Sequence, residues 1–289
     1  MSIKIYYFRI IVVCFCGVLS VAPLCAIFES TPIQGRVQGL CGAFTGLAND
    51  NSAIYYNPAG LVQIKAMQIS SGYTELFGLS DLKNVSFNSS APLPKGYGVG
   101  GVSYLEFGSD IHKETTLTLS HGFNLLQDFY AGYNLNMYSL VFSGYGSATT
   151  LGVDLGIMAR MKRVMKDFRV GIFARNLNIP KVGKEFPKNL PQELTVGVSY
   201  QAYKGAVGIV DVTKEVLSNK TMWKLGFEFE VAKGLILRSG AQDVPQRISV
   251  GFGVGLGPIS FDYALYNHAI LPTTHLVSFG YKFSQKAGK

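Results

Sequence analysis

The stretch RISVGFGVGLG, from Arg247 to Gly257, decides the fold class because it alternates strictly between two kinds of residue. Every second position is apolar, from Ile248 to Leu256, and the positions between them are glycine, serine or arginine. A two-residue period is that of a β-strand, whose successive side chains point to opposite faces of the sheet. The stretch therefore predicts a strand with one apolar face and one face of small or polar residues.

The same period recurs elsewhere in the chain. It is clean over 223–232 (WKLGFEFEVA) and 274–283 (THLVSFGYKF), and less clean over 150–161, 168–177 and 193–202. These stretches are about ten residues long, whereas the usual strand has about five or six. A tilted strand of about ten residues is long enough to cross a membrane.

The composition indicates which way the apolar faces point. Charged residues make up 15% of the 289 residues, there are 33 glycines, and the mean hydropathy is +0.22. A soluble domain averages about 25% charged residues. In a soluble β-sandwich the polar faces meet water, whereas here they are largely glycine and small residues, which suit a crowded interior. We therefore expect an all-β protein of the bacterial outer membrane, a transmembrane antiparallel β-barrel with its apolar faces toward lipid.

Residues 1–26 have the pattern of a secretory signal peptide. Lys4 and Arg9 precede an apolar stretch, and Ala26 ends an approximate cleavage site. A retained transmembrane anchor is the alternative interpretation. Cleavage would leave 24 basic and 18 acidic residues, a net charge of +6, with Cys41 as the one cysteine and hence no internal disulfide. Because the basic residues are scattered, we expect no nucleic-acid partner, and an acidic membrane surface suits them better.

Fourteen strands are predicted over residues 67–283, the barrel domain, and a tail follows over 284–289. An even number is typical of bacterial barrels. Short connections such as 204–205 and 233–234 alternate with longer ones such as 178–190, as periplasmic turns alternate with extracellular loops. The predicted strands are 67–77, 82–92, 97–107, 113–123, 128–142, 149–161, 167–177, 191–202, 206–213, 222–232, 235–243, 246–256, 259–267 and 274–283.

Residues 27–66 do not alternate and form a separate predicted domain. Small residues recur at three- and four-residue steps from Gly39 to Ala48, as on a close-packed helix face. Asn57 then offers a capping side chain, and Pro58 suits the first position of a helix. A fourteen-stranded barrel has a radius of ~14 Å, which its own side chains cannot fill. We expect residues 27–66 to fold back into the lumen as an N-terminal hatch.

The stretch GAFTGLANDNSAIYYNPAGL, residues 42–61, resembles the hatch of the FadL superfamily of outer-membrane proteins. The hatch of that superfamily carries an Asn-Pro-Ala motif, which here is Asn57, Pro58 and Ala59. The resemblance implies a fourteen-stranded barrel with an N-terminal hatch, in agreement with the strand count made from the alternation.

Further segments are similar to the compact PorV/PorQ branch of that superfamily, among them GIVDVTKE over 208–215 and LVSFGYKF over 276–283. The resemblance covers residues 35–283. Such barrels usually end on an aromatic residue read by the outer-membrane assembly machinery, which is an expected partner. Here six residues follow Phe283, and this departure puts the assembly signal in question.

The third predicted strand contains a slip in its period. In YGVGGVSYLEF, Tyr97 and Val99 share a face, but after Gly100 and Gly101 the apolar positions become Val102 and Tyr104. Paired glycines with a slip predict a bulge or kink, and a routine bulge without a role is one interpretation. FadL-type transporters are kinked in this strand, which implies a lateral opening at Gly100 and Gly101 through which an apolar ligand leaves into the bilayer.

The remaining polar residues predict no chemistry. The sequence has no Gly-x-Ser-x-Gly motif and its four histidines are widely spaced, so we expect no enzyme, no metal and no cofactor. The inward charged residues are expected to pair across neighbouring strands, namely Lys224, Glu228, Glu230 and Arg238.

Two functions fit these expectations. The first is passive transport or binding of hydrophobic, fatty-acid-like small molecules through the hatch and a lateral exit. The alternative is a PorV-like secretion component that binds exported proteins at the outer membrane. Membrane lipid is a partner in both; the hydrophobic ligand belongs to the first and the secreted proteins to the second.

Overall fold

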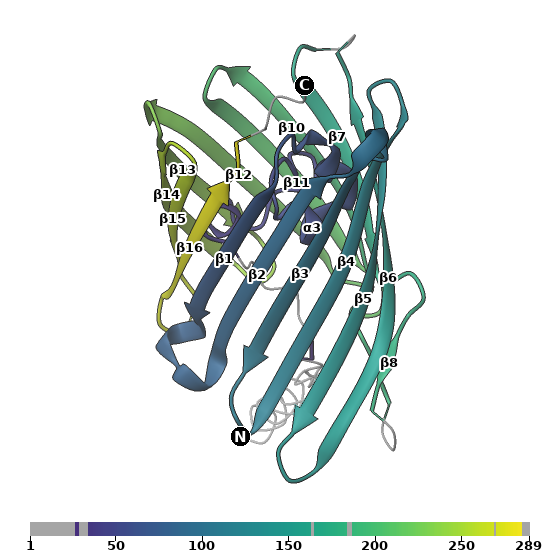
Figure 1. The fold of residues 1–289 in the computed structure, drawn as a ribbon. Coiled ribbons are helices and arrows are strands. Elements are labelled where there is room, and N and C mark those ends of the chain that lie inside the picture. Colours follow the sequence, from purple (N-terminus) through teal and green to yellow (C-terminus); the bar gives the residue numbers. More distant parts are fainter. Residues whose placement is uncertain (1–26, 29–33, 163–164, 184–186, 269, 285–289) are drawn as a thin grey trace, which may run out of the picture.

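The computed structural model describes residues 27–28, 34–162, 165–183, 187–268 and 270–284. The predicted signal peptide and most of the predicted tail lie outside these residues. Within them, fourteen strands form one closed antiparallel barrel, in which each strand pairs with its neighbours along the chain and β1 closes the ring against β16 (Figure 1). The predicted class, the strand count and the antiparallel order are confirmed.

The barrel strands agree with the predicted ranges to within a few residues. The loop predicted over 178–190 contains two further short strands, β8 (Lys181–Val182) and β9 (Lys188–Asn189), which pair with each other. The barrel strands are β1 (Gln68–Glu75), β2 (Lys83–Pro92), β3 (Val99–Gly108), β4 (His112–Leu126), β5 (Phe129–Phe142), β6 (Gly146–Arg160), β7 (Phe168–Arg175), β10 (Glu193–Tyr203), β11 (Ala206–Glu215), β12 (Thr221–Ala232), β13 (Leu235–Gln242), β14 (Arg247–Leu256), β15 (Ile259–Tyr266) and β16 (Thr274–Lys282).

The apolar faces of the strands point outward. Leu119, Leu135 and Leu151 on neighbouring strands are 59%, 51% and 65% exposed on the outer surface, whereas the alternating residues Thr118 and Asn136 are buried in the lumen. This orientation confirms the choice of a membrane barrel over a soluble sandwich, because a soluble sheet would place its polar face in water. No helix in the described ranges is long and apolar enough to cross a membrane.

The two rims of the barrel differ. At one rim, named the short-turn rim, the hairpins at 127–128, 204–205, 233–234 and 257–258 have two residues each, and β1 begins and β16 ends there. The opposite, long-loop rim carries connections such as 76–82 and 176–192 and lies at the bottom of Figure 1. Short turns are periplasmic and long loops extracellular in bacterial barrels.

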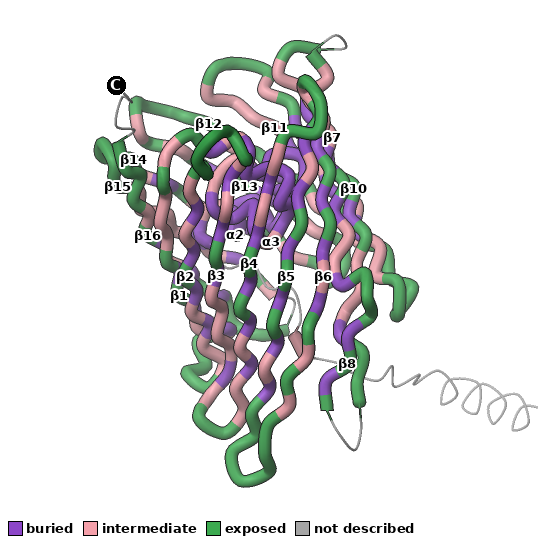
Figure 2. Tube along the Cα trace, turned by 45° about the vertical axis from the view of Figure 1, so that its right-hand side comes forward, coloured by how far each residue is buried: buried purple, intermediate pink, exposed green. Residues whose placement is uncertain are grey.

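The wall is also uneven in height. β4, β5 and β6 have 15, 14 and 15 residues, whereas β13 and β15 have eight each. The three long strands extend the wall on one side of the long-loop rim (Figure 2).

Residues 34–66, named the luminal segment, lie inside the barrel in the half nearer the short-turn rim (Figures 1 and 2). The segment forms α2 (Gly35–Gly39), α3 (Ala53–Tyr56) and the 3₁₀ helix η1 (Pro58–Gln63). Helices this short are not stable alone, so tertiary contacts must hold them. α2 packs on β13 to β16, and η1 packs on β3 to β6.

Polar residues of the wall satisfy the backbone of the luminal segment. The buried carboxylate of Asp211 accepts hydrogen bonds from the N–H groups of Phe44 and Thr45, both at 2.8 Å. The Ser199 hydroxyl donates to the carbonyl oxygen of Gly46 at 2.8 Å. Because buried backbone groups need partners, these small polar side chains fix the position of a segment with little regular structure.

A set of wall glycines, named the glycine belt, lets the luminal segment approach the sheet closely. A methyl group added at any of them would lie 2.3–3.2 Å from an atom of the luminal segment, where little or no space remains. The glycine faces therefore line a crowded lumen, as the composition predicted. The belt comprises Gly122, Gly132, Gly156, Gly171, Gly197, Gly226, Gly240 and Gly251.

Candidate functional site

A cavity lies between the luminal segment and the long-loop rim and is named the luminal cavity. The space between its atoms amounts to about 1000 Å³, a figure that includes open solvent at its mouth. Its floor is α3, and its walls come mainly from β3 to β6. The apolar and aromatic side chains that line it include Phe28, Ile54, Tyr55, Leu105, Phe107 and Tyr138.

The floor of the luminal cavity is fixed to the wall through the backbone of α3. The Asn134 amide donates to the carbonyl oxygen of Ile54 at 2.8 Å, and Arg175 donates to that of Tyr55 at 3.1 Å. The Tyr55 hydroxyl is hydrogen-bonded to that of Ser103. Burial raises the pKa of Tyr55, so its hydroxyl stays neutral at physiological pH.

The charged groups around the luminal cavity are engaged with other protein groups. The Asp154 carboxylate accepts hydrogen bonds from the side chains of Asn134 and Asn136 and from the N–H of Asn176, at 2.8–3.0 Å. Arg175 lies 3.6 Å from Glu193. Because these polar groups bond to one another, the surface that faces the space is mostly apolar. Such a surface suits a hydrophobic ligand that carries few polar groups.

The predicted motif Asn57-Pro58-Ala59 anchors the luminal segment and does not line the luminal cavity. The fully buried Asn57 donates to the carbonyl oxygens of Thr45 at 3.1 Å and of Ile157 in β6 at 3.0 Å. The side-chain oxygen of Asn57 accepts the N–H of Ala59 at 3.2 Å, so this residue caps η1, with Pro58 in the first position. The motif therefore joins two parts of the segment to the wall.

The structure has no bulge at Gly100 and Gly101, whereas the kink predicted as the alternative stays a prediction. Over residues 99–108, all of which are described, β3 pairs with β2 and β4 without a shift in register. The sequence period slips because Val99, which is 4% exposed, faces the luminal segment, whereas Val102 faces outward. Gly101 faces Ile54, whose Cδ1 would lie 3.0 Å from an added methyl group. The role of the two glycines in a lateral opening stays a prediction.

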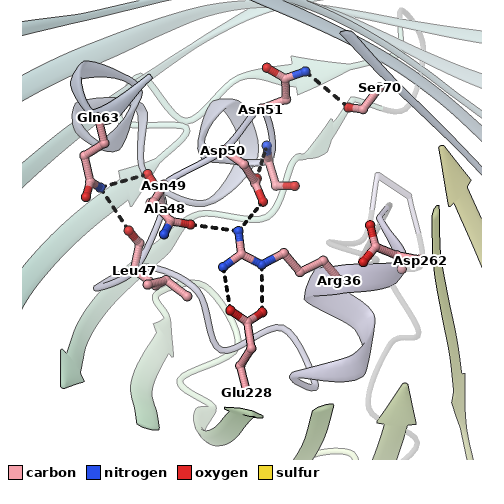
Figure 3. Close-up of polar contacts among 12 residues, drawn as sticks. Arg36, Leu47, Ala48, Asn49, Asp50, Asn51, Gln63, Ser70, Glu228 and Asp262 are labelled. Atoms are coloured by element: carbon pink, nitrogen blue, oxygen red, sulfur yellow. Dashed lines mark hydrogen bonds and ion pairs between the residues drawn. The ribbon is translucent and has the colours of Figure 1, made fainter. Parts of the chain in front are cut away.

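A partly buried ion cluster holds α2 to β12 and β13 (Figure 3). Arg36 binds both carboxylate oxygens of Glu228 in β12, at 2.8 and 2.9 Å, and lies 2.6 Å from Asp50. Arg238 in β13 shares Glu228 at 2.8 Å and binds Asp262 in β15 at 2.7 Å. The predicted pairing of Glu228 with Arg238 is confirmed, but the participation of Arg36, far away in the sequence, was not foreseen.

The predicted pairing of Glu230 is wrong, because its carboxylate accepts the N–H of Gly234 in the adjacent turn. The ion cluster lines a second space of about 1150 Å³, partly open to solvent, which reaches Pro258 and Lys282 at the short-turn rim. The luminal segment thus lies between a mostly apolar cavity on the long-loop side and a space lined by the ion cluster on the other.

Comparisons with known proteins agree with this architecture. Residues 28–170 match an uncharacterised protein family, UPF0164. No curated protein sequence matches the chain. Among solved structures, the toluene transporters TbuX of Ralstonia pickettii and TodX of Pseudomonas putida superpose with TM-scores of 0.67 and 0.66, at 12% and 11% identity, over 89% of this chain and 100% of each of theirs.

A FadL homologue of Pseudomonas aeruginosa superposes with a TM-score of 0.64 at 12% identity, over 90% of this chain and 100% of its own. The chain therefore has the fold of the FadL-type outer-membrane channels. At these identities the likeness concerns the fold and leaves the ligand open.

Proposed function

We propose that the protein is an outer-membrane channel that takes up hydrophobic small molecules. The ligand enters from the long-loop rim into the luminal cavity, and the luminal segment acts as a hatch that closes the barrel below it. The apolar outer wall supports the location in the membrane, and the similarity to the toluene transporters TbuX and TodX supports the class of ligand.

The observation that carries this proposal is the luminal cavity, whose exposed lining is mostly apolar and includes the aromatic residues Phe28, Phe107 and Tyr138. A channel for hydrophilic solutes needs a polar, water-filled passage. Here the passage is occupied by the luminal segment, packed against the glycine belt, and the space above it is lined by aromatic and aliphatic side chains. Such a space releases water when it binds an apolar molecule, which favours binding.

The test is equilibrium binding of labelled toluene and labelled palmitate to the purified protein in detergent, followed by uptake of each in cells that lack their own hydrophobic-molecule channel. Thr116→Trp fills the cavity, because Thr116 lines it, whereas Thr115→Trp adds the same side chain at the adjacent, alternate position of β4. We expect Thr116→Trp to weaken binding at least about tenfold, roughly 1.4 kcal/mol, and Thr115→Trp to bind as the wild type does. Absence of saturable binding of both probes, or equal binding by the two variants, would refute the proposal.

A further inference from the structure

Two arginines lie side by side in the lumen, close to the short-turn rim. Arg160, the last residue of β6, is directly paired with Arg169 near the start of β7. Residues opposite each other in an antiparallel ladder point to the same face, with Cβ atoms about 4.5–5.5 Å apart. That face is the lumen, because Arg169 is 8% exposed and Gly171, two residues further on, meets the backbone of Thr45. Two positive charges are therefore adjacent inside the barrel.

Neither arginine has a counter-charge among the described residues. The Nε atom of Arg169 is buried without a hydrogen-bond partner there, and neither guanidinium forms an ion pair within that part of the chain. The nearby acidic residues do not supply one, because Asp128 is paired with Lys162 at 2.6 Å and Asp167 forms no ion pair with a described residue. An arginine is always charged, and a buried charge without a partner is costly.

The ion cluster on the other side of the barrel shows the usual arrangement. There, Arg36 and Arg238 each contact two carboxylates, at 2.6–2.8 Å. Arg160 and Arg169 have the same charge in the same lumen but no carboxylate. A buried polar group that the protein leaves unsatisfied is a site where an ion or a water binds. Because two like charges meet here, the expected ligand is an anion.

A cavity at the short-turn rim, named the rim cavity, offers the space for such an anion. It lies between the end of η1 and the turn that joins β2 to β3, and Arg160 lines it. Lys65, which follows η1, also lines it, so the positive groups come from both the wall and the luminal segment. Among the described residues, no aspartate or glutamate lines the rim cavity, whereas both line the space beside the ion cluster.

Neutral donors are available in the same cavity. Tyr130 in β5 is 7% exposed and lines the rim cavity, and its hydroxyl makes no hydrogen bond with a described residue. Asn124 in β4 is directly paired with Tyr130 and lines the cavity too. Hydroxyl and amide groups donate hydrogen bonds to an oxyanion, as arginine and lysine do.

We propose that the rim cavity binds a phosphate monoester or inorganic phosphate, held by Arg160, Lys65 and Tyr130, with Arg169 adding its charge from the neighbouring strand. A guanidinium matches a phosphate with two parallel hydrogen bonds. A phosphate monoester carries a charge of about −1.5 to −2 and three acceptor oxygens, which suits several donors better than the single charge of a carboxylate.

A phosphate in this position joins the luminal segment to the wall. Lys65 belongs to the segment, whereas Arg160 and Tyr130 belong to the barrel. A ligand that binds only this arrangement stabilises it, and more so at higher concentration. The proposal goes beyond the proposed function and does not depend on which molecule the luminal cavity binds.

The test is titration calorimetry of the purified protein in a neutral detergent, at constant ionic strength. The probes are inorganic phosphate, glycerol 3-phosphate and dihexanoyl phosphatidic acid, with acetate as the carboxylate control. Arg160→Gln and Arg169→Gln each remove one charge of the pair. Lys233→Gln is the matched control, because Lys233 is exposed in a turn of the same rim and does not line the rim cavity.

We expect saturable binding of a phosphate probe by the wild type, at least about tenfold weaker in each arginine variant and unchanged in Lys233→Gln. Tightest binding of phosphatidic acid would assign the site to a lipid head group, and tightest binding of either other probe to a soluble phosphate. Absence of saturable binding of all three probes would overturn the proposal. Binding of acetate as tight as that of phosphate, or an equal loss in Lys233→Gln, would also overturn it.

A second measurement distinguishes a binding role of Arg169 from a purely structural one. Arg169→Gln loses no protein partner, so its unfolding midpoint in phosphate-free detergent should be no lower than that of the wild type. Phosphate should raise the midpoint of the wild type and leave that of the variant unchanged. A midpoint lowered equally with and without phosphate would show that Arg169 only supports the fold, and would overturn its part in the site.

Discussion

The close fit between the luminal segment and the glycine belt can be tested at Gly240. An added methyl group there would lie 2.4 Å from the carbonyl carbon of Leu40 and 2.6 Å from the nitrogen of Cys41. Both atoms belong to the backbone, so the segment must move by about 1 Å to reach an ordinary contact distance of about 3.5 Å. We therefore take the upper part of the usual overpacking cost, about 3 kcal/mol, for Gly240→Ala.

Part of that cost is offset, because alanine in a strand is more favourable than glycine by roughly 0.5–1 kcal/mol. The net loss is about 2 kcal/mol, which raises the population with a displaced segment about 30-fold. Gly226→Ala is a milder change, because the nearest atom, Cβ of Leu40, would lie at 3.1 Å. Gly208→Ala is the control, since its nearest neighbour, a ring carbon of Phe227, would lie at an ordinary 3.7 Å.

The thiol of Cys41 reports the displacement. The residue is 3% exposed, and burial raises the pKa of its thiol, so a maleimide should label it slowly in the wild type. Labelling is followed by mass spectrometry of the peptide that contains Cys41. We expect rates in the order Gly240→Ala, Gly226→Ala, Gly208→Ala, with the last no faster than the wild type. Equal rates for Gly240→Ala and Gly208→Ala in folded protein would show that the belt does not restrain the segment.

Three further experiments test the anchors and the outer wall. Asn57→Ala removes three hydrogen bonds of the luminal segment, each worth about 1 kcal/mol. We expect the free energy of unfolding, measured with urea in lipid vesicles, to fall by about 3 kcal/mol. A loss below about 1 kcal/mol would contradict the role of Asn57 as an anchor. Glu228→Ala leaves the buried Arg238 and the partly buried Arg36 without their shared partner and should cost about 3 kcal/mol in the same assay, more than Glu228→Gln. Leu135→Arg should cost about 2–4 kcal/mol if that face meets hydrocarbon, whereas Tyr145→Arg in a hairpin turn, where the side chain is 94% exposed, should cost nothing measurable.

Alternation in the sequence was sufficient to predict most strands of the barrel. The stretch quoted first became β14 with its ends within one residue, because every second residue there had to face lipid. The same rule failed at Val99, which is apolar yet faces inward, since the luminal segment offers it an apolar surface. Period alone cannot distinguish lipid from the packed interior of a lumen.

The contacts around the site could not be predicted from the sequence, for a different reason. Arg36 and Glu228 meet across 192 positions of the chain, and a charge pattern does not specify so distant a partner. β7 ends at Arg175, two residues before the predicted end, and the next residue, Asn176, has a left-handed backbone with φ of 53°. The secretion role considered as an alternative is favoured by neither the structure nor the comparisons.

The unequal lengths of the strands have a consequence for how the molecule meets its surroundings. Fifteen residues tilted by about 40° rise about 38 Å along the membrane normal, against an apolar band of about 25 Å, whereas eight residues rise only about 20 Å. In a bilayer centred on the apolar band, the tips of β4 to β6 would therefore stand above that band, and those of β13 and β15 would not. The mouth of the barrel slopes, so molecules at the cell surface meet it screened on one flank and open on the other.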